Sequence, residues 1–380
     1  LQIGEQRHHG DIKNSGLSFY YQYLITKSLG EVGVKPNELD EHFNYLSLLA
    51  WRYKSSSAKE LDLAELAEVN REFTNRFVRV ELTERLTLLT KARILSKRGD
   101  CYSFAYPYVY YFFIGLYLAR HLEEPKIRAW VEDSCKKLYL RDRAHSIMFL
   151  THHAESKWVV ESICQVLREC FSEKKPIELN GDTSFMNGLV ERTSQLTLAA
   201  PDIEKNQSAI RESKDELIEL EPQDDPDEYD LLSFAAKWNL LHKTAEILGL
   251  ILKNNYGSLE RPQKEEMIRV VFDGPLRALR IWLDEVSSDL PGFLAELKKL
   301  EPAGSKNKTS EEVDRQLKVQ VFNIMGWVAT SVIASCANFV VAEKLREDVA
   351  KVVKDCPTNA YRLIEMASRL LRPGAIPIDL

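Results

Sequence analysis

Residues 100–120 read DCYSFAYPYVYYFFIGLYLAR, and the period of this stretch changes in the middle. Tyr102, Phe104 and Tyr106 alternate as in a half-buried strand. Pro107 then ends strand pairing, because proline has no N–H to donate. Beyond it, apolar residues recur every three or four positions, as on the buried stripe of a helix: Val109, Phe112, Phe113, Leu116 and Ala119. The stretch therefore predicts a strand that leads directly into a core helix.

The sequence before this stretch predicts three helices and a hairpin. Helical patterns run from Pro36 to a break at residues 54–57, from a cap at Asp62 to Phe73, and from Leu82 to Lys97. Lys97-Arg98-Gly99-Asp100 is a turn sequence between Ile94-Leu95 and the aromatic strand. Three helices followed by a hairpin is the order of a winged-helix unit, which we expect at residues 31–122.

Nine aromatic residues fall between Tyr102 and Tyr117, and they are open to two interpretations. Large rings remove much apolar area from water, so they would seat the strand and the helix on a shared core. Alternatively, they would form a stacking platform for bases or an aromatic cage. The core interpretation carries more weight.

The composition is that of an ordinary globular protein of two or three domains, with 380 residues, 44% hydrophobic and 28% charged. The formal net charge of −6 argues against bulk affinity for nucleic acid. The cysteines lack C-x-x-C spacing and predict a reducing, cytoplasmic compartment: Cys101, Cys135, Cys164, Cys170, Cys336 and Cys356. The chain starts at Leu1 without an apolar leader, so we expect a piece of a longer polypeptide.

The rest of the chain has helical periodicity, so the expected fold class is mainly α. We expect a winged-helix module with a small β-hairpin, followed by an α-solenoid-like helical array. An acidic stretch that cannot bury apolar area predicts a linker. The expected segments are an N-terminal helical segment at 1–30, the winged helix at 31–122, helical repeats at 123–200, the acidic linker at 201–230 and a C-terminal helical domain at 231–380.

The C-terminal domain has two features that bear on its fold. Asp273-Gly-Pro275 predicts a break between two helices, Pro262–Val271 and Leu276–Val286. Gly304–Thr309 predicts a flexible turn and lacks the frame of a phosphate-binding loop. The last helices are expected at Asp314–Lys344, Leu345–Lys354 and Thr358–Arg372.

Val319–Ala342 holds no charged residue and is long enough to cross a bilayer. A buried central helix is the favoured interpretation and a membrane span is the alternative. Six polar residues would be costly in hydrocarbon: Gln320, Asn323, Thr330, Ser331, Ser335 and Asn338. Four small residues would suit close helix packing inside a protein: Gly326, Ala329, Ala334 and Ala337. We therefore expect no membrane partner.

A winged helix can place its third helix in the major groove of DNA. Five basic residues lie on and just after that predicted helix: Arg85, Lys91, Arg93, Lys97 and Arg98. Glu81 and Glu84 accompany them, and such a mixture is usually a solvated face. Duplex binding stays open as the less favoured interpretation, without a strong nucleic-acid signal.

Catalytic signatures are absent from the sequence, which has no phosphate loop, no G-x-S-x-G, no H-E-x-x-H and no dinucleotide-binding glycine pattern. His145, His152, His153 and Glu155 form a metal-like group, since His145 and His152 would share the face of an unbroken helix. Thr151 instead predicts a cap between two helices, so a structural turn is favoured over a metal site. We predict no catalytic, cofactor-binding or metal-binding residue in this chain.

Three stretches resemble the part of STAND-type NTPases, which are NACHT-like or AAA-like, that follows the nucleotide-binding core. They are Ser15-Gly-Leu-Ser-Phe-Tyr-Tyr-Gln-Tyr-Leu-Ile25, the aromatic Tyr102–Ala119, and Ala144–His153, which is similar to a stretch of bacterial members. The resemblance covers about residues 1–175. It implies that residues 1–30 end the NTPase-associated helices, and that ATP and Mg²⁺ bind in the parent protein outside this chain. No catalytic residue is carried over.

The resemblance further implies a switch used in bacterial antiphage defence. Residues 1–122 would be an adaptor, and residues 123–380 a sensor that recognises a phage or other foreign protein. Recognition would trigger ATP-dependent oligomerisation of the parent protein and activation of a separate N-terminal effector. The candidate partner-binding anchors are Trp130, Trp158, Trp238 and Trp282. The alternative for each tryptophan is that its side chain fills the core. The rival function is a winged-helix DNA-binding regulator with a helical ligand-binding domain.

Overall fold

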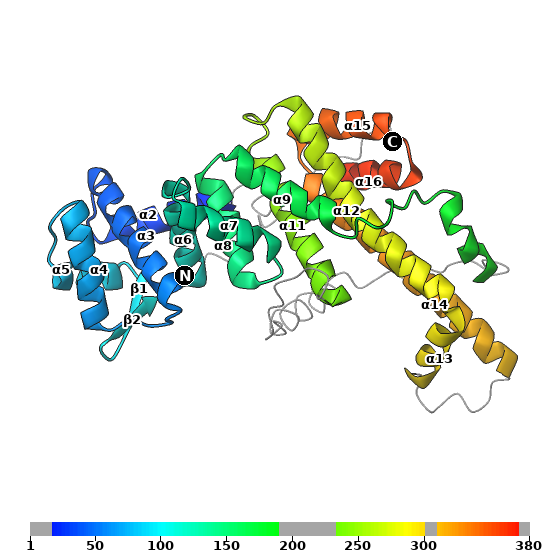
Figure 1. Ribbon diagram of the computed structural model, residues 1–380, viewed down its shortest axis with the longest axis horizontal. Helices are drawn as coiled ribbons and strands as arrows, with labels where there is room; N and C mark the ends of the chain where they lie inside the picture. The colour runs from blue at the N-terminus through cyan, green and yellow to red at the C-terminus, as the bar shows by residue number, and fades with distance from the viewer. Residues whose placement is uncertain (1–16, 190–232, 301–309, 372–380) are drawn as a thin grey trace. The chain divides into compact units, whose positions relative to one another are not determined.

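The computed structural model describes residues 17–189, 233–300 and 310–371, and this part of the chain is mainly helical (Figure 1). The fold class predicted from the sequence is confirmed to that extent. The chain divides into two compact units, residues 1–163 and 164–380. The predicted acidic linker at 201–230 and the predicted turn at Gly304–Thr309 lie outside the described residues.

Unit 1 contains a run of helices interrupted by one hairpin. Its elements are α2 (Leu17–Glu31), the 3₁₀ turn η1 (Pro36–Glu38), α3 (Leu39–Ser56), α4 (Leu63–Arg76), α5 (Leu82–Lys91), β1 (Leu95–Arg98), β2 (Cys101–Phe104), α6 (Pro107–Arg120), α7 (Pro125–Lys136), α8 (Arg141–His153) and the first half of α9 (Lys157–Glu169). Prolines begin η1, α6 and α7, where the missing N–H costs nothing.

The hairpin pairs β1 with β2 in antiparallel register and turns at Gly99, whose φ of +61° lies in the left-handed region that glycine tolerates. Leu61, in the segment between α3 and α4, forms an isolated antiparallel bridge with Tyr102 of β2. Its N–H and C=O both bond the backbone of Tyr102 at 2.9 Å. The hairpin is thereby tied to the helices that precede it.

The predicted helix from Leu82 to Lys97 is too long, because α5 ends at Lys91. Arg93 has a left-handed φ of +56°, and its N–H bonds the Thr90 carbonyl at 3.0 Å. The Ile94 N–H bonds the Leu89 carbonyl, also at 3.0 Å. These two bonds form a Schellman cap, which ends the helix and turns the chain into β1.

Arg85 is buried, contrary to the sequence interpretation that gave it a place on a DNA-facing surface. Its side chain is 0% exposed and lies between the rings of Tyr45 and Phe73, with the guanidinium carbon 4.2 and 4.4 Å from the ring centres. Nη2 donates to Glu41 Oε1 at 2.7 Å and Nη1 donates to Asn70 Oδ1 at 2.9 Å. One guanidinium therefore joins α3, α4 and α5.

The aromatic stretch forms the core of unit 1. None of its nine rings is exposed, and they contact one another and rings from α2 and α3, including Tyr21 with Tyr108 at 4.7 Å and Phe43 with Phe113 at 5.4 Å. α6 packs against α2, α3 and α8. Its buried surface is therefore wider than the single apolar stripe that the sequence predicts. Gly115 permits the contact with α8, because a Cβ there would lie 2.5 Å from the Phe149 backbone.

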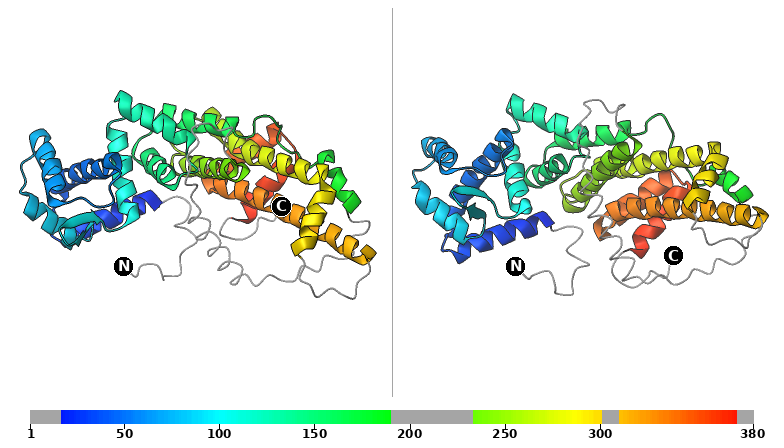
Figure 2. Two further views of the ribbon diagram at one scale, coloured as in Figure 1. Left: turned by 60° about the horizontal axis from the view of Figure 1, so that its bottom comes forward. Right: turned by 90° about the horizontal axis from the view of Figure 1, so that it is seen from below.

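Unit 2 consists of the second half of α9 and a helical bundle. The further elements are η2 (Gly181–Leu189), α11 (Phe234–Asn254), α12 (Arg261–Ser288), α13 (Leu290–Leu300), α14 (Ser310–Val340), η4 (Glu343–Leu345), α15 (Arg346–Asp355) and α16 (Asn359–Leu370). α12 packs against α11, α14 and α15, and α14 also packs against α16. Figures 1 and 2 show α12 and α14 running side by side.

The predicted break at Asp273-Gly-Pro275 is absent, because α12 continues through Pro275. Proline removes the helical bond to the Val271 carbonyl four residues earlier. The Cys336 thiol, on α14, lies 3.9 Å from that carbonyl and faces it as a weak donor. Gly274 gives room beside the proline, since a Cβ there would lie 2.8 Å from the Leu167 side chain. Tertiary packing thus keeps the helix continuous.

Close packing on α14 uses Gly249 of α11 rather than the predicted Gly326. A Cβ on Gly249 would lie 2.6 Å from the Phe339 carbonyl oxygen, whereas a Cβ on Gly326 would meet nothing within 4 Å. Lys253, also on α11, donates to the Asn338 carbonyl at 3.2 Å, near the end of α14. Desolvation of this buried ammonium lowers the pKa of Lys253 to about 8.

α14 is the helix, in the part of the chain that the structure describes, that is long and apolar enough to cross a membrane, with a mean hydropathy of 1.4 over an 18-residue window within Arg315–Val340. One side packs on α11, α12 and α16. The exposed positions on the other side are mostly polar: Gln316, Gln320, Asn323, Thr330 and Asn338. Polar residues facing outward are typical of a helix in water. The predicted burial therefore holds for one side of α14 alone, since 28% of the apolar window is buried.

We predict that Arg85→Met lowers the free energy of unfolding of unit 1 by about 3 kcal/mol, because it leaves Glu41 and Asn70 without their buried partner. Urea denaturation read by hydrogen exchange in α3 and α5 measures the effect. Arg79→Met is the control, because the Arg79 side chain is 84% exposed and pairs only with Glu81. Equal stability of the two variants would contradict the role of Arg85.

Two Gly→Ala substitutions are expected to act in opposite directions. Gly115→Ala forces α6 from α8 and should destabilise unit 1 by about 1–3 kcal/mol. Gly326→Ala meets open space and should stabilise unit 2 by about 0.5–1 kcal/mol through helix propensity. Thermal unfolding of each variant, followed by hydrogen exchange in the affected unit, checks the signs. A stabilising Gly115→Ala would show that the two helices are not in close contact.

Candidate functional site

The histidines of α8 pack into unit 1. His153 Nε2 lies 3.1 Å from the Phe112 carbonyl, and desolvation lowers the pKa of His153 to about 3. The His145 ring stacks on Tyr111. The sequence prediction that Thr151 is a helix cap is wrong. α8 continues to His153, and the chain turns after that residue. Among the residues that the structure describes, no group of three or more His, Cys, Asp or Glu side chains could hold a metal ion.

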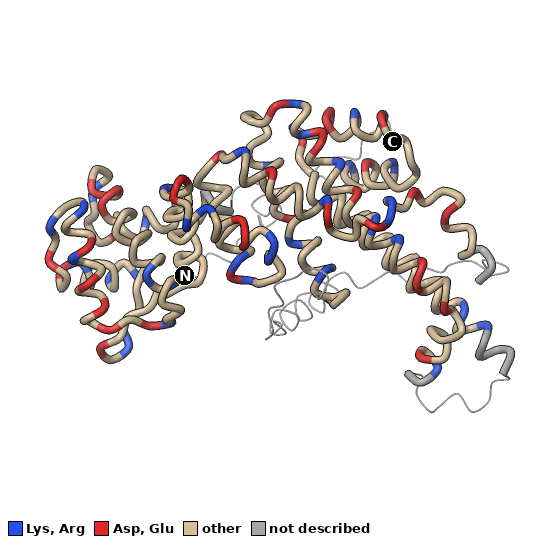
Figure 3. Tube along the Cα trace, viewed as in Figure 1, with Lys and Arg blue, Asp and Glu red and all other residues tan. Residues whose placement is uncertain are grey.

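The candidate nucleic-acid face on α5 and the hairpin is mixed in charge, and four of its five predicted basic residues are exposed: Lys91, Arg93, Lys97 and Arg98. With Arg85 buried, the exposed residues of the helix are Thr83, Glu84, Thr87 and Lys91. Beyond the helix, Arg98 of the hairpin pairs with Glu60 at 3.6 Å. Figure 3 shows charges of both signs along α4 and α5. Such a mixed surface does not supply the phosphate contacts that dominate duplex affinity.

The four tryptophans predicted as partner-binding anchors are all half-buried. In unit 1, Trp130 contacts Trp51 at 5.9 Å and lies under Arg143, whose guanidinium carbon is 4.6 Å from the ring centre. Trp158 lies under Arg128 at 4.8 Å. These two rings are covered by cations of their own unit. In unit 2, Trp238 contacts Phe234 with ring centres 6.1 Å apart.

Trp282 is the predicted anchor that lines a pocket. The pocket has a volume of about 420 Å³ and lies where α12 and α13 meet the start of α11. Its walls combine aromatic and acidic side chains. They are Phe234, Trp282, Glu285, Val286, Asp289, Gly292, Phe293 and Glu296.

Helix periodicity and one turn build this pocket. Trp282, Glu285 and Asp289 lie on one face of α12 or at its end, because they are three and four residues apart. Asp289 Oδ1 accepts a hydrogen bond from the Gly292 N–H at 3.1 Å, and the Asp289 carbonyl accepts one from Phe293 at 3.0 Å. A Cβ at position 292 would press on the Asp289 carboxylate, so a residue other than glycine would require this side chain to shift.

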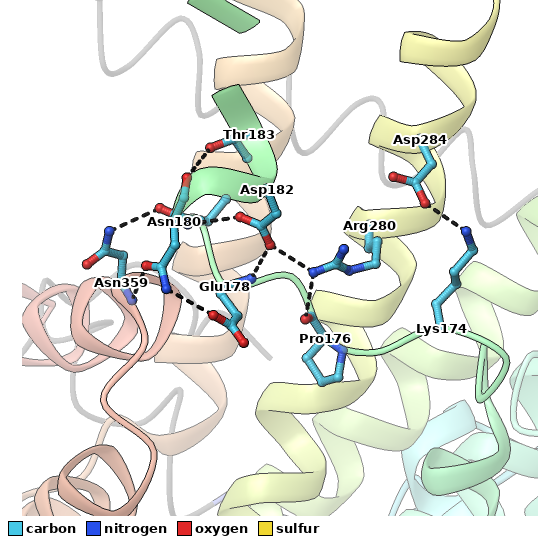
Figure 4. A network of polar contacts seen from close by, with 10 residues as sticks. Lys174, Pro176, Glu178, Asn180, Asp182, Thr183, Arg280, Asp284 and Asn359 are labelled. Atoms are coloured by element: carbon cyan, nitrogen blue, oxygen red, sulfur yellow. Dashed lines mark hydrogen bonds and ion pairs between the residues drawn. The ribbon is translucent and has the colours of Figure 1, made fainter. Parts of the chain in front are cut away.

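Residues 174–183, here called the strap, are a loop and the start of η2, and they contact α12 through Arg280 and Asp284 (Figure 4). Its centre is Asp182, whose carboxylate accepts from the N–H groups of Glu178 and Asn180 at 2.8 and 2.9 Å. Arg280 of α12 donates to the same carboxylate at 2.8 Å and to the Pro176 carbonyl at 3.2 Å. Lys174 pairs with Asp284 at 2.8 Å.

The strap also holds the start of α16. The Asn359 side-chain amide donates to the Leu179 carbonyl at 3.1 Å, and the Ala360 N–H donates to the Glu178 carbonyl at 2.9 Å. Leu179 has a φ of +56°, a left-handed conformation that is rare for leucine. The strap thus joins α12 to α16 and engages Lys174 and Arg280 in ion pairs.

One family model matches the chain. Residues 59–114 match the family described as Novel STAND NTPase 4. This segment is a STAND NTPase-related region. It runs from the Leu61 bridge through α4, α5 and the hairpin into α6. No curated protein and no solved structure matches the chain.

Sequence reasoning missed two parts of this picture. The buried state of Arg85, inside the STAND NTPase-related region, has no sequence signal besides aromatic residues at suitable spacings on α3 and α4. The acidic residues of the pocket did have a signal, since Trp282, Glu285 and Asp289 share helical spacing with each other. Trp327 of α14, which is 71% exposed, was not among the predicted anchors.

We predict that Asp182→Ala loosens the strap, because it leaves two backbone N–H groups and the Arg280 guanidinium without their shared acceptor. The expected cost is about 2–3 kcal/mol, read as faster hydrogen exchange at residues 176–183 and in the first turn of α16. Asp284→Ala removes only the exposed pair with Lys174 and should have little effect. Unchanged exchange in Asp182→Ala would mean that the strap does not depend on this carboxylate.

Proposed function

We propose that the chain is the adaptor and sensor region of a STAND NTPase that recognises a foreign protein, such as a phage protein, in antiviral defence. Recognition would trigger ATP-dependent oligomerisation of the parent protein and effector activation. The family match at residues 59–114 carries this proposal, because it relates unit 1 to STAND NTPases. A helical array with a pocket next to the predicted anchor Trp282 supports a recognition role for unit 2.

We interpret residues 31–122 as a winged-helix adaptor. The chain order supports this, since α3, the Leu61 bridge, α4, α5 and the β1–β2 hairpin follow one another as in winged-helix units. In the adaptor, Arg85 fixes the three helices from within, so the outer surface stays free to pack on another domain. The helices that follow would form the α-solenoid-like sensor.

The proposed location is the cytoplasm of a bacterium. All six cysteines are free thiols, which fits a reducing compartment. Four of them are buried and behave as small apolar core residues.

We propose that ATP and Mg²⁺ bind in the parent protein outside this chain. Its sequence has no phosphate loop, and the described residues offer no carboxylate and histidine group that could hold a metal ion. We therefore place nucleotide binding in the rest of the parent protein. This chain would contribute the difference in affinity between two forms of the parent protein. A foreign protein that binds the open form more tightly than the closed form shifts the equilibrium to the open form.

A DNA-binding regulator is less well supported. The helix that would enter the major groove has its central arginine buried and a glutamate on its exposed face. Salt-dependent duplex binding by this chain would restore that alternative.

Co-expression of the chain with single phage proteins, followed by affinity purification and mass spectrometry, tests the proposal. We expect one defined phage protein to co-purify, and to do so again in high salt. Recovery of nucleic acid alone, or of no phage protein by a well-folded chain, would contradict the sensor assignment.

A further inference from the structure

The pocket between α12 and α13 has one charge sign and an aromatic lining. Glu285, Asp289 and Glu296 contribute carboxylates, and Trp282, Phe234 and Phe293 contribute rings. None of the eight lining residues is basic. A volume of about 420 Å³ is enough for one long side chain and lies toward the lower end of the range for ligand pockets.

We propose that this pocket binds an arginine or lysine side chain of the foreign protein. The proposal rests on the proposed function and names the chemistry of its partner. A cation over an aromatic face is attracted by the negative charge of the ring face, and carboxylates at the same site add direct ionic bonds. Both kinds of group are present in the pocket.

Other ligand classes fit the pocket less well. An anion such as phosphate would be repelled by three carboxylates. An uncharged apolar group would take the Glu285 carboxylate out of water without offering it a partner, which costs free energy. A basic side chain satisfies rings and carboxylates together, so charge complementarity selects it.

Two nearby cations of unit 2 are engaged outside the pocket. Lys174 pairs with Asp284, and Arg280 donates to Asp182 and to the Pro176 carbonyl. Among the ion pairs of the described residues, none involves Glu285 or Asp289. The strap therefore keeps these two basic residues on its own side of α12 and leaves the acidic face for a partner.

The test is fluorine NMR of the 380-residue chain labelled with 5-fluorotryptophan, with the Trp282 signal assigned through Trp282→Phe. The probes are N-acetyl-arginine methylamide and its uncharged analogue, N-acetyl-citrulline methylamide. We expect the arginine probe to shift the Trp282 signal saturably and the citrulline probe to leave it unchanged. The signal of the exposed Trp327 is the internal control.

Matched charge variants make the assignment specific. Glu285→Gln should weaken binding of the arginine probe by about fivefold, as expected for loss of one partly exposed ionic contact. Glu347→Gln makes the same charge change on the 89% exposed Glu347 of α15 and should leave the affinity unchanged. Asp289 is left intact because it caps the turn into α13.

Equal shifts by the arginine and citrulline probes, or equal affinities of the two Glu→Gln variants, would overturn the inference. Its failure is distinguishable from failure of the proposed function. A phage protein that co-purifies equally with wild type and Glu285→Gln supports the sensor but contradicts the pocket. If no phage protein co-purifies, the sensor assignment fails, and the NMR titration still decides whether the pocket binds a basic side chain.

Discussion

A guanidinium taken out of water needs acceptors for its N–H groups, and in both units such a group ties helices together through most of its donors, while the Nε of Arg85 and of Arg280 has no partner among the described residues. In unit 1, Arg85 uses Glu41 and Asn70 and is enclosed by two rings, which fixes α3, α4 and α5 together. In unit 2, Arg277 of α12 donates to the carbonyls of Leu167, Arg168 and Cys170 at the end of α9. Arg280, one turn further along α12, holds the strap.

This constraint bears on how function is assigned. An arginine on a third helix looks like a DNA contact in the sequence, but the fold uses Arg85 as an internal tie. The exposed surface that remains on α5 is mixed in charge, whereas the pocket on α12 and α13 has charge of one sign and an aromatic lining. The chemistry of these surfaces favours recognition of a protein over recognition of a duplex.

Local signals in the sequence predicted much of the fold. The Asp62 cap, the prolines at helix starts and the Gly99 turn each act through their own backbone, so they can be recognised without tertiary information. The failures come from tertiary packing. Pro275 stays within α12 because neighbouring helices accommodate it, and Arg85 is buried because acceptors arrive from two other helices. The pocket needs α12 and α13 to meet, and helical spacing within each helix does not predict that contact.

Hydrogen exchange of the chain, measured with and without a purified phage protein that it captures, tests the central claim most directly. The account predicts protection at residues 282–296, around the pocket of unit 2, and unchanged exchange at residues 82–98. Protection confined to α5 and the hairpin would contradict it and would make unit 1 the recognition surface.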